Sequence, residues 1–288
     1  MKRAWLVSTL AALTALGVGV VPATGVVPGG DGMIAYSVSH DGVERIALIQ
    51  AEGTGLIELP EVEGVSNYLP AWSPDGTRIA YVRWPGEGQG STDIWVMDAD
   101  GTNRERVTRN ARYDNHPAWS PDGTMLVFER GALWVKVLGG GAPKRITNVR
   151  SWQPSWSPDG SVIAFMRYGG DLYTVRPDGT SLTRLTHTPK VFETRPAWSP
   201  DGAHIAFDGV PEGGSTGVFV MDADGTDVVT LTNTPGGFEG QPAWSPSGGR
   251  IAYITGYPME LWVMASDGAD PAFVTGSYAW EPDWQPLA

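Results

Sequence analysis

The sequence predicts an all-β protein, a six-bladed β-propeller built from four-stranded blades. The first observation is a Pro-x-Trp motif that recurs six times, with about 42 residues between successive Trp residues. The second is that each of the first five motifs is followed by a tight turn and then by three short apolar segments. The third is composition, since 38 Gly and 23 Pro among 288 residues favour many short strands and tight turns. Four strands in roughly 40 to 45 residues are typical of a propeller blade.

The repeat defines the strands of each blade. Ser-Pro-Asp-Gly follows four of the motif Trp residues and degenerates to Ser-Pro-Ser-Gly at 245–248, and Pro followed by Asp-Gly favours a tight turn. Second strands are expected at 79–81, 126–128, 163–165, 205–207 and 251–253, and third strands at 94–97, 133–135, 172–175, 218–221 and 261–264. Fourth strands are expected to end at Thr108, Thr147, Thr186, Thr232 and Thr275. The first strands carry Trp72, Trp119, Trp156, Trp198, Trp244 and Trp284.

The two ends of the chain complete the count of blades. Residues 33–36, 46–49 and 56–59 match the second, third and fourth strands of a blade, but no Pro-x-Trp strand precedes them. The missing strand occurs at 281–284, so we expect the C-terminal strand to complete blade one and close the ring. A closed ring leaves no sheet edge that could pair with another chain, and we therefore expect a monomer.

The first 23 residues predict an export signal. Lys2 and Arg3 precede an apolar segment over 5–21, and small residues stand at the −3 and −1 positions of a cleavage site after Ala23. A short linker over 24–29 and the propeller over 30–288 would follow. The mature chain is expected in the periplasm or outside the cell, without stable membrane insertion. The alternative is that the segment is kept as a membrane anchor.

Composition excludes several functions. The formal net charge of −12 opposes non-specific binding to nucleic acid or to anionic lipid. With no Cys, the chain has no disulfide scaffold, thiolate metal site or Cys nucleophile. Two Asp-x-Asp-Gly turns beginning at Asp98 and Asp222 mimic the start of a calcium loop but lack its final Glu. We expect no cofactor and no metal.

The repeated pattern Pro-Ala-Trp-Ser-Pro-Asp-Gly, Ile-Ala-Phe/Tyr and Trp-Val-Met-Asp-Ala-Asp-Gly-Thr resembles the TolB-type propeller, a WD-like repeat of bacterial cell-envelope proteins. The resemblance covers nearly all of residues 30–288 and implies the six-bladed fold. TolB carries an α/β domain ahead of its propeller, and this chain is expected to lack it. The motifs are specific for the repeat class and not for a function.

Strand direction predicts a ring of variable residues at a channel mouth. The Ser-Pro-Asp-Gly turns and the third-to-fourth turns should share one face, the turn face. The second-to-third loops and the links between blades should share the other, the connection face. The residue three before each motif Trp varies while its neighbours repeat, so function rather than folding could dictate it. The alternative is a ring of solvated channel residues. These residues are Leu69, His116, Gln153, Arg195, Gln241 and Glu281.

Three Trp residues of the mature chain lie outside the repeat positions. Trp152 and Trp280 both precede a motif Trp by four residues, and Trp84 is expected in a Gly-rich loop on the connection face. Exposed aromatic side chains beside the polar ring would form a platform for a peptide or a sugar. The alternative for Trp152 and Trp280 is packing between blades.

The sequence favours a non-enzymatic, exported propeller that binds an envelope protein, peptide or glycan at the mouth. Gly213-Gly214-Ser215-Thr216-Gly217 matches a hydrolase motif as a string, but it leads into a strand, whereas a nucleophile elbow leads into a helix. The similar oligogalacturonate lyase group uses several mouth histidines for a metal, and here the ring has His116 alone. The alternative is a polysaccharide-active enzyme, a lyase or hydrolase with acid–base groups at the same mouth. No catalytic residue is assigned.

Overall fold

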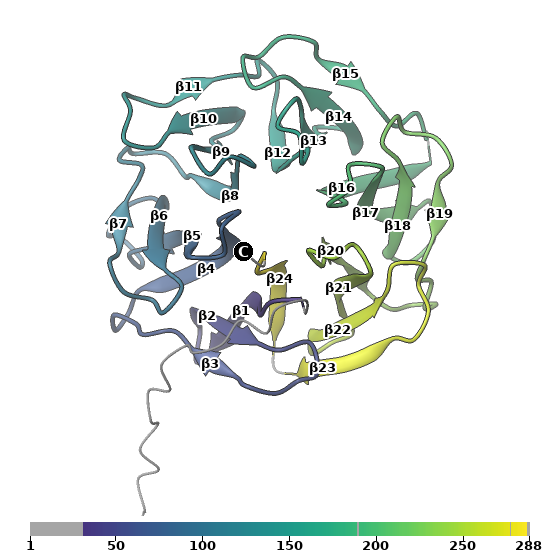
Figure 1. The fold of residues 1–288 in the computed structure, drawn as a ribbon, viewed down its shortest axis with the longest axis horizontal. Coiled ribbons are helices and arrows are strands. Elements are labelled where there is room, and N and C mark those ends of the chain that lie inside the picture. The colour runs from purple at the N-terminus through teal and green to yellow at the C-terminus, as the bar shows by residue number, and fades with distance from the viewer. Residues whose placement is uncertain (1–30, 189, 277, 287–288) are drawn as a thin grey trace, which may run out of the picture.

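The computed structural model describes residues 31–188, 190–276 and 278–286, in which all regular structure is β-strand. Six four-stranded antiparallel sheets surround a central axis (Figure 1), which confirms the six-bladed propeller. The expected export signal and linker lie outside the described residues. Among the described residues, no helix is long and apolar enough to cross a membrane.

Within each blade, the four strands follow one another from the centre of the ring to its rim (Figure 1). Blades one to three contain, in that order, β24 (Ala279–Trp284), β1 (Ile34–His40), β2 (Val43–Ile49) and β3 (Ile57–Glu58); β4 (Ser66–Trp72), β5 (Arg78–Trp84), β6 (Asp93–Asp98) and β7 (Glu105–Arg106); β8 (Asn115–Trp119), β9 (Met125–Glu129), β10 (Leu133–Val137) and β11 (Lys144–Arg145). Blades four to six contain β12 (Ser151–Trp156), β13 (Ile163–Arg167), β14 (Asp171–Val175) and β15 (Thr183–Arg184); β16 (Val191–Trp198), β17 (His204–Pro211), β18 (Gly217–Asp222) and β19 (Val229–Thr230); β20 (Glu239–Trp244), β21 (Arg250–Thr255), β22 (Glu260–Ala265) and β23 (Ala272–Gly276).

Strand β24 closes the ring as the sequence predicts. It pairs antiparallel with β1, with Ile34 opposite Trp284, and the Gln285 backbone N–H donates to the Met33 carbonyl at 2.8 Å. The Trp284 side chain is 3% exposed and packs in the cluster between blades six and one. Residues more than 200 positions apart in the sequence therefore form one continuous sheet.

The repeated residues hold the blades together. In the turn of blade three, the Asp122 carboxylate accepts hydrogen bonds from the Ser120 hydroxyl at 2.6 Å and from the Thr124 N–H at 3.0 Å, while Gly123 takes a φ of 68°. The motif Trp packs against the preceding blade, as Trp119 does when its indole Nε1–H donates to the Ala71 carbonyl at 3.0 Å. The repeat thus encodes turns and blade-to-blade packing.

Five of the outermost strands end earlier than the sequence predicts. Strands β3, β7, β11, β15 and β19 contain two residues each. The Thr expected to end each fourth strand explains the difference in four blades. In blade two, the Thr108 hydroxyl accepts the Ile94 backbone N–H at 3.0 Å, so a side chain takes over from the backbone ladder. Thr147, Thr186 and Thr232 make the equivalent bond.

Candidate functional site

A cavity of about 620 Å³ occupies the central channel. Its volume lies in the range of small-ligand and peptide-side-chain pockets, roughly 300 to 1,000 Å³. The wall between its two ends consists of Pro and Ala residues, Ser155, Asp283 and the motif residues Trp198, Trp244 and Trp284. One end is lined by the six variable residues of the ring, and the other by the turn prolines Pro74, Pro121, Pro158, Pro200, Pro246 and Pro286.

A repeated backbone feature places the ring residues. Each of the six has a positive φ, between 47° and 60°, at an irregularity in the pairing of the first strand with the second. Non-glycine residues rarely adopt this conformation, so neighbouring blades must hold it in place. The Arg195 N–H donates to Gln153 Oε1 at 3.1 Å, and the Glu281 N–H donates to Gln241 Oε1 at 2.6 Å. The two glutamines therefore connect one blade to the next.

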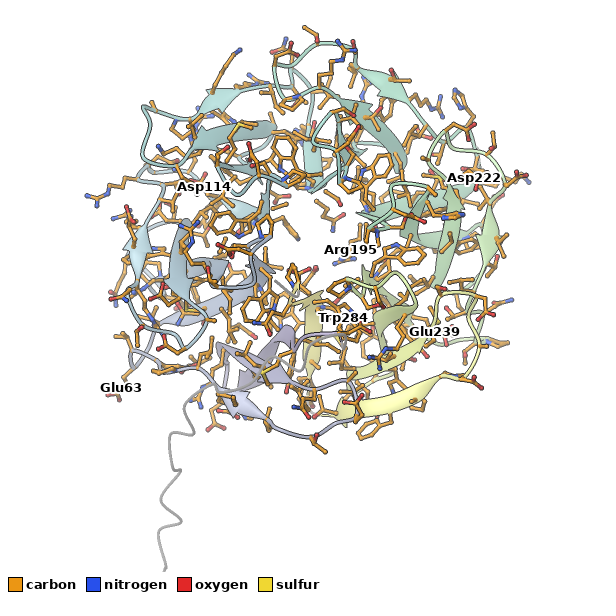
Figure 2. All side chains as sticks on the ribbon, viewed as in Figure 1. Glu63, Asp114, Arg195, Asp222, Glu239 and Trp284 are labelled. Carbon is orange, nitrogen blue, oxygen red and sulfur yellow. The ribbon has the colours of Figure 1, made fainter. Side chains whose placement is uncertain are left out.

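Five charged side chains form a chain of contacts across the channel. The Arg195 guanidinium, which points into the opening of the ring (Figure 2), contacts Glu281 at 2.9 Å and Asp208 at 3.1 Å. Glu281 Oε1 also lies 3.9 Å from His116 Nε2, and His116 Nδ1 lies 3.2 Å from Glu129. Since these residues come from blades one, three and five, the contacts span the lumen at the level of the ring.

These contacts shift the pKa values of the ring. Burial alone would raise the pKa of Glu281, but the charges of Arg195 and His116 lower it to about 2. For His116, burial lowers the pKa, yet the charges and hydrogen bonds of Glu129 and Glu281 raise it to about 10. Burial raises the pKa of Asp208 to about 6, with Arg195 opposing the shift. At neutral pH the ring therefore holds a protonated His116 and an ionised Glu281.

The structure brings the predicted ring together at one end of the channel cavity. We expected His116, Gln153, Arg195, Gln241 and Glu281 at a mouth on the connection face. All five line the cavity, and its other end is lined by the prolines of the turn face. The repeated irregularity in the first strand gives each of them the same place in its blade. Whether they bind a ligand stays a prediction.

The three remaining Trp residues are not part of the cavity wall. Trp84 is the last residue of β5, paired with Ser66, and not a loop residue as expected, because the strand continues beyond its apolar core. Trp280 stacks on Tyr68 with ring centroids 5.7 Å apart and donates its indole N–H to Glu44 at 3.2 Å. Trp152 is tilted against Tyr168 at 6.2 Å.

Three carboxylates near the ring were missed. Asp208 and Glu129 lie on second strands, where the sequence pattern gives no sign that they reach the ring. Asp283 did leave a signal, since it occupies the position before a motif Trp where four of the other blades have Ala. Its carboxylate accepts the Trp72 backbone N–H at 2.6 Å, and burial raises its pKa to about 7.

The residue before each motif Trp also explains why two indole N–H groups lack a hydrogen-bond partner. Where it is Ala, its carbonyl accepts the Nε1–H of the next blade's motif Trp at 3.0 to 3.2 Å. Where it is Asp283 or Ser155, the side chain accepts that Trp's backbone N–H instead. The indole Nε1 atoms of Trp72 and Trp198 then have no hydrogen-bond partner among the described residues.

In the described part of the chain, no group of three or more His, Cys, Asp or Glu side chains is arranged to hold a metal ion.

Comparisons with known proteins agree with this geometry. The family model of the TolB beta propeller domain matches residues 33–168 and 129–286. The Tol-Pal system protein TolB of Thioalkalivibrio sulfidiphilus is 39% identical over 77 residues, which are 26% of this chain and 17% of that protein.

Solved structures show the same fold. TolB from Acinetobacter baumannii superposes with a TM-score of 0.77 at 25% identity, covering 88% of this chain and 67% of that one. An oligogalacturonate lyase in complex with manganese reaches a TM-score of 0.55 at 14% identity, covering 87% of this chain and 73% of that one, which shows a shared fold alone. Because the family model covers nearly all of the described residues, the chain belongs to the TolB β-propeller domain family.

Proposed function

We propose that this chain is an exported, non-catalytic propeller that binds a segment of an envelope protein or peptide in its central channel. The observation that carries the proposal is the cavity of about 620 Å³, lined at one end by a charged ring and at the other by the turn prolines. Membership of a family that includes a Tol-Pal system protein supports a scaffold or protein-binding role. Export rests on the sequence of residues 1–23.

The chemistry of the ring supports binding over catalysis. A general acid or base needs a group whose pKa lies near the working pH and which can reach the substrate. The pKa of His116 is raised to about 10 and that of Glu281 is lowered to about 2, so neither would exchange a proton readily near pH 7. Asp283 does meet the pKa criterion, because it lines the cavity and burial raises its pKa to about 7. A polysaccharide-active enzyme that uses this group, or a glycan ligand, is therefore the alternative.

The test is a substitution that fills the channel without touching the charged ring. Ala118 lines the cavity wall, so Ala118→Phe should block it, whereas Ala203→Phe places the same side chain on an exposed turn outside the cavity lining. Each protein is incubated with envelope extract, and the proteins recovered are compared. Partners retained by the parent and by Ala203→Phe but lost by Ala118→Phe would support the proposal.

A parallel assay separates the alternative. The parent protein is incubated with a panel of polysaccharides, and the release of reducing or unsaturated ends is measured. Activity that Ala118→Phe abolishes would replace the binding proposal with the enzyme. A partner retained equally by all three proteins would contradict a channel site.

A further inference from the structure

We propose that the outer edge of blade three is a second binding site, distinct from the channel, for an anionic polysaccharide. We call it the cationic edge, and it consists of Lys136, Lys144 and Arg145 on strands β10 and β11. Strand β11 lies at the outer rim of the ring (Figure 1). The proposal does not depend on the function of the channel.

The cationic edge belongs to a segment that has the same length in every blade. The segment holds the third and fourth strands and contains 15 residues. In five blades it contains between two and four Asp or Glu residues. In blade three, residues 132–146 contain no Asp or Glu and three cations. The equivalent segments are 45–59, 93–107, 171–185, 217–231 and 260–274.

The turn between the third and fourth strands shows this change of charge most clearly. In four blades the turn is closed by an Asp whose carboxylate accepts a backbone N–H at 2.8 to 3.0 Å. Blade three has Gly139 at this position, and Lys136 closes the turn by donating to three of its backbone carbonyls at 2.8 to 2.9 Å. In the other five blades the Lys136 position is a buried apolar residue. Either arrangement closes the turn, so folding does not dictate a positive charge there.

An arginine at the rim has no carboxylate partner in blade three. Arg106, Arg145 and Arg184 are equivalent, and each donates its Nε–H to a Thr carbonyl at 2.7 to 3.0 Å. Arg184 also contacts Asp171 at 2.7 Å, and Arg106 has an equivalent Asp partner. Blade three has Ala132 in place of this Asp. The Arg145 guanidinium is therefore oriented by the backbone but can still bind a carboxylate with two hydrogen bonds.

The three cations lie on both sides of the blade, at its outer edge. Residues directly opposite each other in an antiparallel pair lie on the same side of the sheet. Arg145 is opposite Trp134, which packs toward blade two, so Arg145 and Lys136 are on that side. Lys144 is opposite Val135, which packs toward blade four. Since no strand of the described chain continues the sheet beyond β11, an extended polymer that crosses the edge can contact both sides.

Two exposed carboxylates flank the cationic edge without pairing with it. Glu105 lies on the side of blade two that faces blade three, and Asp178 lies in a turn of blade four. Hydrogen bonds from Thr180 lower the pKa of Asp178, and the charges of Arg176 and Lys144 lower it further. None of the three edge cations makes an ion pair with a described residue. The edge therefore keeps a net positive charge.

The cationic edge lies in the less acidic half of the ring. Residues 66–190, which form blades two to four, contain 15 Lys and Arg against 12 Asp and Glu. Residues 31–65 and 191–286, which form blades five, six and one, contain 3 Lys and Arg against 20 Asp and Glu. An anionic polymer is therefore repelled by one half of the ring and directed to the other. The net charge of −12 does not prevent binding at blade three.

The composition of the edge favours an anionic polysaccharide over a protein segment. Protein interfaces depend on buried aromatic or apolar anchors. Within residues 132–146, Val137 is the one large apolar side chain that is exposed, at 51%. Clusters of Lys and Arg without such anchors are typical of sites for anionic polysaccharides. Rigid sugar rings also hold successive carboxylates in place, so a polyuronate loses less conformational entropy on binding than an acidic peptide does.

The experiment measures dissociation constants for alginate oligomers, which carry one carboxylate per sugar. Dextran is the uncharged comparison, and poly-glutamate with the same number of carboxylates represents an acidic protein segment. The edge variant is Lys144→Gln/Arg145→Gln. The matched control is Arg112→Gln/Lys190→Gln, which removes two exposed cations from the links before blades three and five. Melting curves verify that each variant is folded, and Ala118→Phe verifies that the oligomers do not use the channel.

We expect the parent to bind alginate and not dextran. The edge variant should weaken this binding roughly tenfold, a loss of about 1.4 kcal/mol, whereas the matched control and Ala118→Phe should retain the affinity of the parent. Added salt should weaken binding to the parent more steeply than binding to the edge variant, because fewer charges contribute in the variant.

Four results would overturn the proposal. The parent does not bind alginate at low salt, or the edge variant binds it as tightly as the parent does. The matched control or Ala118→Phe loses as much affinity as the edge variant, which would place the polymer elsewhere on the ring or in the channel. Poly-glutamate binds through Lys144 and Arg145 more tightly than alginate, which would assign the edge to an acidic protein segment.

Discussion

The two faces of the ring differ in how their polar groups are used. On the turn face, Asp75, Asp122, Asp159 and Asp201 occupy equivalent positions, and each accepts hydrogen bonds from its own Ser-Pro-Asp-Gly turn. On the connection face, the exposed side chains change from blade to blade, and Arg150 and Arg167 have no ion-pair partner among the described residues. Residue types therefore recur from blade to blade on the turn face and vary on the connection face.

This difference separates folding from recognition. A residue that closes the same turn in each blade is restricted to one residue type, and it makes its hydrogen bonds within its own blade. A residue at a loop end is free to vary, so its identity can serve a partner. The channel ring is intermediate, because Arg195 and Glu281 vary in sequence yet contact each other at 2.9 Å.

The largest effect should come from breaking the repeat at the closing strand. Deleting residues 278–288 removes β24 and exposes the apolar surface that Trp284 covers. Loss of one buried Trp alone costs about 3 to 5 kcal/mol, so we expect insolubility or a melting temperature lower by at least about 10 °C. The control is Tyr113→Ala, whose side chain is 62% exposed, and which should cost less than about 1 kcal/mol. A truncated protein that melts within a few degrees of the parent would contradict closure by β24.

A smaller but substantial effect should follow from removing the central cation. Arg195→Met leaves Asp208, 1% exposed, and Glu281 without their partner. We expect a loss of about 2 to 4 kcal/mol in the free energy of unfolding, below the full cost of breaking a buried pair because the Arg195 side chain is 28% exposed. The same change at the exposed Arg150 should cost under about 0.5 kcal/mol. Chemical denaturation of both variants checks this, and equal losses would show that the ring side chains are solvated.

The fold was predictable from the sequence because each structural role recurs. The motif Trp, the Ser-Pro-Asp-Gly turn and the three apolar segments appear with fixed spacing, and closure by the C-terminal strand follows from the count. The ring residues were also predictable, since each precedes a motif Trp by three residues. Their ion pairs were not, because the contact of Arg195 with Glu281 joins blades five and one across the channel and leaves no trace in the spacing of the repeat. Asp208 was missed for a similar reason: only the tertiary arrangement brings its strand to the ring.

A third prediction concerns pH and a position where the channel wall departs from the repeat. Burial raises the pKa of Asp283 to about 7, against about 3.9 in an unfolded chain. Between these values the folded protein binds more protons than the unfolded one, so the free energy of unfolding should fall as the pH rises from about 4 to 7. Asp208, with its pKa raised to about 6, contributes in the same direction.

Asp283→Asn should flatten this dependence. The amide oxygen can still accept the Trp72 N–H but cannot titrate. The free energy of unfolding of the parent should fall between pH 5 and pH 8 by at least about 1 kcal/mol more than that of the variant. This is less than the equivalent of one unit of pKa shift. Urea denaturation at the two pH values measures it. Parallel pH profiles for parent and variant would mean that Asp283 ionises normally in the folded protein.

The smallest expected effect tests the turn face where the repeat itself is incomplete. Blade six has Ser247 in place of the turn Asp, and its hydroxyl contacts the Ser245 hydroxyl at 3.0 Å and accepts the Gly249 N–H at 3.3 Å. A carboxylate near the start of the described chain adds to this turn. Asp31 accepts the Ser247 N–H at 3.2 Å and contacts Arg250 at 2.8 Å. Asp31→Ala should therefore cost about 1 kcal/mol, the value of a hydrogen bond to a charged group at a partly exposed site.

A double-mutant cycle makes this prediction specific. Ser247→Asp alone should destabilise the parent slightly, because two carboxylates would then compete for the same turn and for Arg250. In the Asp31→Ala background, Ser247→Asp should restore stability, since the turn would regain the carboxylate that the other blades carry. The coupling energy should therefore be of opposite sign to the two single losses and of about 1 kcal/mol in size. Independent, additive losses would show that Asp31 and the side chain at 247 do not act on the same turn.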